Sequence, residues 1–199
     1  MNRILLFLFA LIGGASAGRA QLLSQIELDT VKVYHSLAAA LKEPDKVHRL
    51  ELSKEKLKVV PEEIRKLKNL NALDLGRNKL SELPAWMREL QYMQEFSAGN
   101  NRFTEVPGTI CNWKHLKRLD LHQNRLTGIP ACMGEMKELV SLDLWSNDLE
   151  DFPDELNGMK ALRFMDVRAI QFSQAEIDRI TALLPHVKIF FSQPCNCGN

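Results

Sequence analysis

The sequence predicts an α/β solenoid: a right-handed arc with a parallel β-sheet on its concave face, short helices or 3₁₀ turns on its convex face, and a cap at each end. Apolar residues return every 23 residues along most of the chain, and asparagine and proline return at the same interval. Fixed self-similarity at this period is typical of solenoids, in which each unit buries its apolar face against its neighbours. Because a solenoid is mostly surface, we expect function to lie on a face and not in a pocket.

Each unit opens with a strand whose inward side chains are apolar. The first residues of the six units are Val47, Leu70, Met93, Leu116, Leu139 and Leu162. The inward positions three and five residues later are held by Leu50 and Leu52, Leu73 and Leu75, Phe96 and Ala98, Leu119 and Leu121, Leu142 and Leu144, and Met165 and Val167. Polar or small residues alternate with them, as in a half-buried strand. Strands that repeat at a fixed interval lie parallel, so one parallel sheet is expected.

Asparagine and proline recur after the strand. The asparagines are Asn78, Asn101, Asn124 and Asn147, and the prolines are Pro61, Pro84, Pro107, Pro130 and Pro153. At a bend the backbone cannot pair with itself, and a buried amide can satisfy both a donor and an acceptor there, so we expect a structural asparagine ladder. Proline fixes φ and keeps the preceding residue extended, which turns the chain onto the convex face. Too few residues remain in each unit for a long helix there.

Both ends depart from the pattern, as the terminal units of a solenoid do. The ladder position is Glu55 in the first unit and Ile170 in the last. At the N-terminal end we predict a strand over residues 31–34 and a helix that Ser36 caps. At the C-terminal end, Ser173 and Glu176 form a capping box that starts a helix ending before Pro185, and a closing strand follows over residues 187–191.

The first twenty residues are typical of an export signal. Arg3 precedes an unbroken apolar run over residues 4–12, and small residues follow, with cleavage expected after Ala17 or Ala20. A buried segment or a membrane anchor is the alternative, but nine apolar residues fall short of the ~20 that span a bilayer. The predicted organisation is a signal peptide at 1–20, an N-terminal cap of a short strand and a helix at 21–46, six repeats at 47–69, 70–92, 93–115, 116–138, 139–161 and 162–184 (the last serving as cap helix), and a closing strand with a Cys-x-Cys tail at 185–199. The expected location is secreted or periplasmic, with no membrane span.

The pattern Leu-x-x-Leu-x-Leu-x-x-Asn-x-Leu followed by Leu-Pro-x-x-Ile resembles the leucine-rich repeat in its 23-residue form. The resemblance covers residues 47–184, and five successive units carry the proline. It implies a curved solenoid with parallel strands that binds proteins, and sometimes glycans or peptides. The whole chain is also similar to short exported leucine-rich repeat proteins of Gram-negative bacteria.

Composition and motifs argue against several functions. Without Arg3 and Arg19, 24 basic residues stand against 25 acidic ones, a poor match to nucleic acid, whose binders concentrate positive charge on one face. The chain has no Gly-x-Ser-x-Gly elbow, no His-Glu-x-x-His pair and no glycine loop for phosphate. Its five histidines are scattered over different faces. We therefore expect neither an enzyme nor a cofactor.

The four cysteines leave the redox state open. Cys111 and Cys132 fall on adjacent coils, so a disulfide is possible, although their 21-residue spacing is two short of the period and could exceed the ~7 Å limit on the Cα separation. Cys195 and Cys197 are too few for structural zinc, which takes four ligands, and are interpreted as exposed thiols that can pair between molecules. One outward column of the strands is mostly acidic: Glu51, Asp74, Ser97, Asp120, Asp143 and Asp166. Calcium needs six to eight oxygens, several of them from one loop, and this column does not supply them, so no metal is expected.

A second outward column is more unusual. It holds Ser53, Gly76, Gly99, His122, Trp145 and Arg168, small at one end and bulky at the other. Tryptophan, arginine and other aromatic residues are enriched at binding hot spots. The predicted partner-binding residues are Arg118, Asp120, His122, Asp143, Trp145, Phe164 and Arg168. The alternative is that Trp145 packs on His122 or Arg168 merely to cover the sheet.

These observations predict an exported, non-enzymatic protein–protein interaction module that binds a protein or peptide on its concave β-face. A structural role is the alternative, in which copies assemble through the Cys-x-Cys tail or the closing strand. Glycan binding is a third interpretation. The sequence identifies neither the partner nor the oligomeric state.

Overall fold

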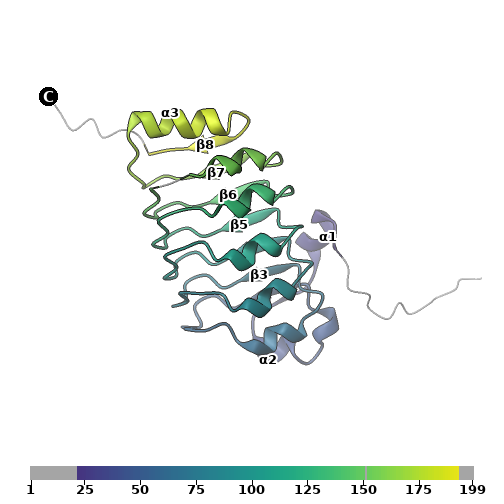
Figure 1. The fold of residues 1–199 in the computed structure, drawn as a ribbon. Helices are drawn as coiled ribbons and strands as arrows, with labels where there is room; N and C mark the ends of the chain where they lie inside the picture. The colour runs from purple at the N-terminus through teal and green to yellow at the C-terminus, as the bar shows by residue number, and fades with distance from the viewer. Residues whose placement is uncertain (1–21, 151, 193–199) are drawn as a thin grey trace, which may run out of the picture.

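One parallel sheet of eight strands runs through the structure, a computed structural model that describes residues 22–150 and 152–192 (Figure 1). The predicted signal peptide and the Cys195-x-Cys197 tail lie outside the described residues. The strands follow one another in chain order across the sheet. They are β1 (Val33–Tyr34), β2 (Arg49–Glu51), β3 (Ala72–Asp74), β4 (Glu95–Ser97), β5 (Arg118–Asp120), β6 (Ser141–Asp143), β7 (Phe164–Asp166) and β8 (Lys188–Phe190). The predicted α/β solenoid is confirmed.

The 23-residue period of the sequence is the register of the sheet from β2 to β7. Leu73 pairs with Phe96, and Leu119 pairs with Leu142, so each residue lies beside its equivalent in the next unit. Equivalent side chains therefore form columns across the sheet, inside and outside alike. Any property of one column can be followed from strand to strand.

The other side of each coil is a short 3₁₀ helix that starts after the repeated proline. These helices are η2 (Glu62–Lys66), η3 (Ala85–Glu89), η4 (Gly108–Asn112), η5 (Ala131–Glu135) and η6 (Asp154–Gly158), and a shorter one, η1 (Pro44–Lys46), lies in the N-terminal cap. Each proline before η2 to η6 has extended backbone dihedrals, as Pro84 does with φ −66° and ψ 146°. Five residues make only one to two turns of 3₁₀ helix, which agrees with the expectation that too few residues remain in each unit for a long helix.

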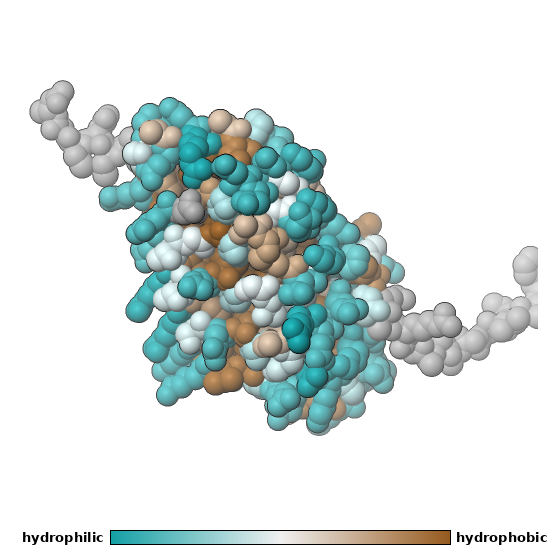
Figure 2. Space-filling model, in the orientation of Figure 1, coloured by the Kyte–Doolittle hydropathy of each residue, from teal (hydrophilic) through white to brown (hydrophobic). Residues whose placement is uncertain are grey.

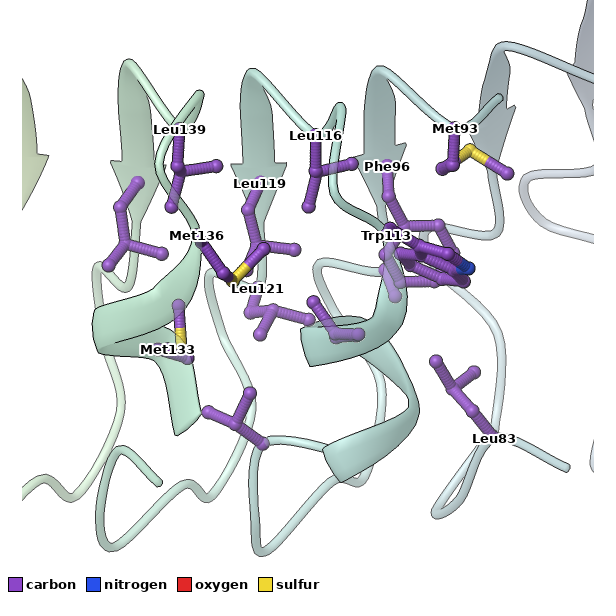
Figure 3. Packing of buried hydrophobic residues seen from close by; sticks show 14 of the residues in the cluster. Leu83, Met93, Phe96, Trp113, Leu116, Leu119, Leu121, Met133, Met136 and Leu139 are labelled. Carbon is purple, nitrogen blue, oxygen red and sulfur yellow. The ribbon is translucent and has the colours of Figure 1, made fainter. Parts of the chain in front are cut away.

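The core lies between the sheet and the 3₁₀ helices. Figure 3 shows Leu116, Leu119 and Met136 pointing into this interior from successive parts of the coils. Trp113 is fully buried there, with its ring centroid 4.9 Å from that of Phe96. Its indole N–H donates to the backbone carbonyl of Met87 (2.9 Å), so the buried polar atom is satisfied. Trp113 is therefore a packing residue of the core.

Each coil bends sharply after its strand, at a residue in the left-handed region. The residues with positive φ at this position are Lys54, Arg77, Asn100, Gln123, Ser146 and Ala169. None is glycine, so each bend carries a conformational cost of about 1 kcal/mol. The ladder asparagine follows directly and holds the bend: Asn124 accepts from the Phe103 N–H (3.1 Å) and donates to the carbonyls of Ala98 (3.1 Å) and Leu121 (3.0 Å).

Caps close both ends of the stack (Figure 1). Ser36 caps α2 (Leu37–Ala40) by accepting from the Ala39 N–H, and the expected capping box of Ser173 and Glu176 starts α3 (Gln174–Leu183). An additional helix, α1 (Gln25–Thr30), was not predicted from the sequence. No helix in residues 22–150 or 152–192 is both long and apolar enough to cross a membrane.

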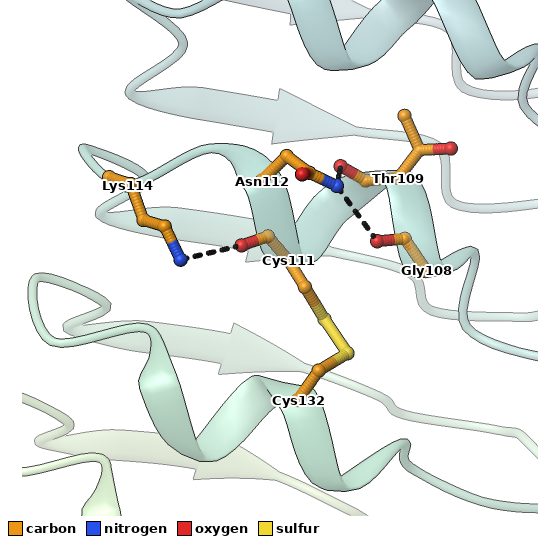
Figure 4. Close-up of a disulfide and its surroundings, with 6 residues drawn as sticks. All are labelled: Gly108, Thr109, Cys111, Asn112, Lys114 and Cys132. Atoms are coloured by element: carbon orange, nitrogen blue, oxygen red, sulfur yellow. Dashed lines mark hydrogen bonds between the residues drawn. A yellow bond between two sulfur atoms is a disulfide. The ribbon is translucent and has the colours of Figure 1, made fainter.

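A disulfide joins two neighbouring 3₁₀ helices on the convex side (Figure 4). Cys111 in η4 and Cys132 in η5 have Cα atoms 5.9 Å apart, within the range that the bond allows. The two-position offset from the period therefore does not separate the cysteines too far. Elsewhere, on the side of the molecule that Figure 2 shows, hydrophilic side chains cover most of the surface, with smaller hydrophobic areas between them.

Candidate functional site

The solvent side of β2 to β8 is the surface on which the predicted site lies, and we call it the sheet face. Its first column holds Arg49, Ala72, Glu95, Arg118, Ser141, Phe164 and Lys188. Its second column holds Glu51, Asp74, Ser97, Asp120, Asp143, Asp166 and Phe190. The third column, two residues further along the chain, is the one that contains His122, Trp145 and Arg168. All seven predicted partner-binding residues thus share this face, over β5 to β7 and the bends that follow them.

The aspartates of the second column have a structural role that the sequence analysis missed. The Asp120 Oδ1 accepts the backbone N–H of His122 (3.1 Å), and the Asp143 Oδ1 accepts that of Trp145 (3.0 Å). Asp74 does the same for Gly76 (2.7 Å). Each carboxylate therefore satisfies a backbone donor just before the bend. The recurrence of aspartate two residues before a third-column residue was the signal available in the sequence.

A glycine makes room for the row of rings in the third column. A Cβ atom on Gly99 would lie 2.3 Å from Cε1 and Nδ1 of His122, so the imidazole occupies the space that a side chain would take. The His122 ring is 5.9 Å from the Trp145 ring, at an interplanar angle of 33°. Trp145 contacts His122 and remains partly exposed. The change from small to bulky residues along this column therefore reflects packing within the chain, since Gly99 makes room for His122, as well as the shape of the exposed surface.

Most charges on this part of the sheet face are paired. Arg118 donates to Glu95 (2.8 Å), and His122 Nδ1 contacts Asp120. Arg168 makes two hydrogen bonds through Nε and one through Nη2 to Asp166, the shortest at 2.6 Å. Burial alone would raise the pKa of Asp166, but the hydrogen bonds from Arg168 outweigh it and hold the pKa below its ordinary value.

Asp143 differs from its neighbours in the column. Among the residues that the structure describes, its carboxylate receives one hydrogen bond, from the Trp145 N–H. Asp120 by comparison also receives the hydroxyl of Ser97 (2.8 Å) and contacts His122. The pKa of Asp143 is raised above its ordinary value, first by burial and then by the charges of Asp120 and Asp166. Within the described residues Asp143 makes no ion pair of its own, and the charge of His122 opposes the rise in its pKa without cancelling it.

The same residues form a grouping that could accept a metal ion. One ligand atom each from Asp120, His122 and Asp143 lies within 4.8 Å of the others. Three ligands are fewer than calcium or structural zinc takes, so the chain supplies only part of a coordination shell. The absence of a metal remains an expectation from the sequence.

Phe164 gives the sheet face an exposed apolar area. Its residue is 49% exposed and pairs across the strands with the small Ser141. Its partner on the other side is Lys188, so Phe164 has no apolar neighbour in its column and keeps about half of its surface in water. Together with Trp145 it supplies the kind of side chain that anchors interfaces.

The N-terminal segment covers part of the other half of the sheet face. Leu23 and Leu28 pack on Ala72, whose residue is 3% exposed although its side chain points to the solvent side of β3. Two buried amides hold the backbone of Leu23: its N–H donates to Asn71 Oδ1 (3.1 Å), and its carbonyl accepts from Gln94 Nε2 (2.8 Å). The cover is confined to the first column near β3: Glu51, Asp74 and Ser97 in the second column stay partly exposed and line a hollow on this half of the face, together with Arg49, Glu95 and Arg118. The sequence analysis missed this cover.

Comparisons with known proteins agree with the fold. A family model described as leucine rich repeat matches residues 93–149 and 114–169. A leucine-rich repeat protein of Leptospira interrogans is 32% identical, with a TM-score of 0.67, over 80% of this chain and 40% of that one. No curated protein matches the chain.

Two further solved structures share the fold at lower identity. Internalin C2 of Listeria monocytogenes is 20% identical over 79% of this chain and 66% of its own, with a TM-score of 0.64. The ectodomain of a plant membrane receptor kinase of Arabidopsis thaliana, solved in complex with Casparian strip integrity factor 2, is 23% identical, with a TM-score of 0.60, over 75% of this chain and 19% of its own. The chain thus spans less than half the length of the Leptospira protein and about a fifth of the receptor ectodomain.

Proposed function

The chain is a leucine-rich repeat protein, and from that premise we propose that it is an exported, non-enzymatic binding protein whose sheet face docks a protein or a peptide. Leucine-rich repeat folds commonly mediate such binding, and the plant receptor ectodomain above was solved with a bound factor. The observation that carries the proposal is the pair of aromatic residues on the β5 to β7 half of the sheet face: Phe164, which is 49% exposed, and Trp145, which is partly exposed.

The physical argument concerns the apolar surface that a partner would remove from water. An exposed aromatic side chain contributes most when a partner covers it, because its large apolar surface then leaves water. Arg118 and Arg168 lie beside the aromatic residues with charged groups partly exposed, and arginine is the other residue type enriched at hot spots.

The test is capture of extracytoplasmic proteins of the source cell with immobilised variants. The Trp145→Ala variant should bind a captured partner about 30-fold more weakly than wild type, which is the loss expected for a hot spot of about 2 kcal/mol. Val59→Ala is the matched control, since Val59 is 65% exposed and lies away from the sheet face. Equal affinity of wild type and Trp145→Ala for the captured partner would contradict the proposal.

Export is the second part of the proposal. It is supported by the charge and apolar run at residues 1–20 and by the Cys111–Cys132 disulfide, a bond that persists in oxidising compartments. Expression of the full chain in a bacterium and N-terminal sequencing of the product should give a protein that starts at Gly18 or Gln21. Recovery of an uncleaved chain in the cytoplasm would contradict export.

Assembly of copies is the alternative function. Strand β8 pairs with β7 and lies at the end of the strand order, so an open strand edge remains there. Size measurement with and without reductant distinguishes the two functions. A reductant-sensitive dimer supports assembly through the cysteine tail, whereas a stable monomer supports binding of a separate partner.

A further inference from the structure

The charge balance of the β5 to β7 half of the sheet face points to a particular kind of partner. Three aspartates follow one another in the second column, and two of them have a basic side chain of their own: His122 for Asp120 and Arg168 for Asp166. The third, Asp143, lies between them with one oxygen on the Trp145 N–H. His122 and Arg168 act on the charge of Asp143 from a distance, but each is bonded to another carboxylate, so Asp143 has no ion pair of its own within the described residues.

The cations nearby are already engaged. Arg118 donates to Glu95, which also pairs with Arg49 (2.8 Å). Lys188 lies over the ring of Phe190, at 5.0 Å from its centroid. Moving either side chain to Asp143 would break the contact it now makes. A positive charge supplied from outside the chain would gain the attraction of Asp143 without that loss.

The surroundings of Asp143 suit a long basic side chain better than a small ion. Trp145 lies two residues along the same strand direction, and the exposed ring of Phe164 lies on the neighbouring strand beside Ser141. Lysine and arginine place their methylene stems on apolar surface and keep the charged head at a polar group. Aromatic faces also attract such cations directly. The aromatic neighbours therefore offer apolar surface for the stem, and Asp143 offers a polar group for the charged head.

We propose that the partner presents a lysine or arginine side chain whose stem lies on Trp145 and Phe164 and whose charged head pairs with Asp143. The inference rests on the proposed function, because it names the chemistry of the ligand for the same face. The raised pKa of Asp143 supports it, since a carboxylate crowded by burial and by two like charges is stabilised by a cation. A divalent metal ion on Asp120, His122 and Asp143 is the competing occupant, and the test distinguishes it.

Two variants isolate the charge. Asp143→Asn keeps an oxygen for the Trp145 N–H and removes only the negative charge, so the bend retains its hydrogen bond. Asp74→Asn is the matched control: it lies in the same column and makes the same bond, to Gly76, but in the half of the face where α1 is docked. Asp143→Lys reverses the charge. Circular dichroism establishes that each variant is folded.

The experiment selects a random heptapeptide library on the immobilised full-length protein, first in EDTA and then with added zinc or calcium. Wild type should enrich peptides that contain lysine or arginine, in EDTA. A synthetic peptide from that selection should bind Asp143→Asn about 5- to 10-fold more weakly, and Asp74→Asn within twofold of wild type. Replacing the basic residue of the peptide with norleucine should abolish the difference between wild type and Asp143→Asn. Asp143→Lys should enrich acidic peptides instead.

Each other outcome has a distinct meaning. Enriched peptides without a basic residue, or equal affinity for wild type and Asp143→Asn, would overturn the inference and leave the proposed function standing, provided that Trp145→Ala still weakens binding about 30-fold. Binding that needs added metal and disappears in EDTA would assign the carboxylates to an ion and also overturn it. Failure of wild type to enrich any peptide would count against the proposed function and the inference together.

Discussion

Replacing a ladder asparagine with alanine tests how the bends are held, and the structure predicts different costs at two positions. Asn124→Ala removes hydrogen bonds to the N–H of Phe103 and to the carbonyls of Ala98 and Leu121. Both carbonyls keep a second amide donor, because Asn101 also donates to Ala98 (3.0 Å) and Asn147 also donates to Leu121 (3.0 Å). Only the buried Phe103 N–H loses its partner. We expect a loss of about 2 kcal/mol in the free energy of unfolding, within the 1–3 kcal/mol range for one unsatisfied buried group.

Asn147→Ala should cost about twice as much. It leaves the Leu126 N–H without its acceptor (3.1 Å), as the first variant leaves Phe103. It also removes the donor of the Leu144 carbonyl (2.9 Å), and no second amide replaces it because Ile170 occupies the next ladder position. Two buried backbone groups are then unsatisfied, which predicts about 4 kcal/mol.

Urea unfolding followed by far-UV circular dichroism measures both values, if the slope of free energy against urea is unchanged between variants. Asn112→Ala is the control, since Asn112 is exposed in η4 and its amide makes only long contacts of 3.3 and 3.4 Å within that helix. It should change stability by less than about 0.5 kcal/mol. If Asn147→Ala costs no more than Asn124→Ala, or if both match the control, the count of unsatisfied groups is not what sets the stability of the bends.

Two further predictions concern the convex side. Gly134→Ala should lower the free energy of unfolding by about 3 kcal/mol, because its Cβ would lie 2.1 Å from the backbone carbonyl oxygen of Glu155 in η6; Gly108→Ala, with nothing within 4 Å, is the control, and equal melting temperatures would refute the clash. Replacing Cys111 and Cys132 together with serine should cost about 3 kcal/mol, from the loop entropy of the 21-residue separation. Reductant should lower the urea midpoint of wild type but not of the double variant, and an unchanged wild-type midpoint would show that the bond contributes nothing.

The repeat allows most of the fold to be predicted because its period is also the strand register. Once Leu73 and Phe96 are recognised as equivalent, the sheet, the columns and the order of strands follow without further information. The 3₁₀ helices follow as well, since a proline-led segment of fixed length has to return to the next strand. The capping box at Ser173 was visible in the sequence because its partner Glu176 lies three residues away. Local rules and the period account for these features.

Helix α1 could not be found in the same way. Its six residues are too few to form a helix alone, so tertiary contacts decide whether it exists. Leu28 of the helix packs on Ala72, and Asn71 and Gln94 bind Leu23 just before the helix begins. The equivalence of Asn71 and Gln94 in the repeat gave no indication that a distant segment would bind them. The capping box of Ser24 and Glu27 was a local signal for the start of the helix, but it does not say where the helix docks.

The packing of the N-terminal segment on Ala72 bears on which part of the sheet face can bind a partner. If the whole face were open, the aromatic and charged residues near β6 would be one group among many. Leu23 and Leu28 bury Ala72 in the first column near β3, whereas the bulky aromatic residues near β6 have no such cover from the N-terminal segment. Near β6 the repeat explains Asp120, and Asp166 pairs with Arg168. Trp145 and Phe164 remain as aromatic side chains that are at least partly exposed, and Asp143 remains without an ion pair of its own within the described residues, so a basic side chain of a partner can contact all three.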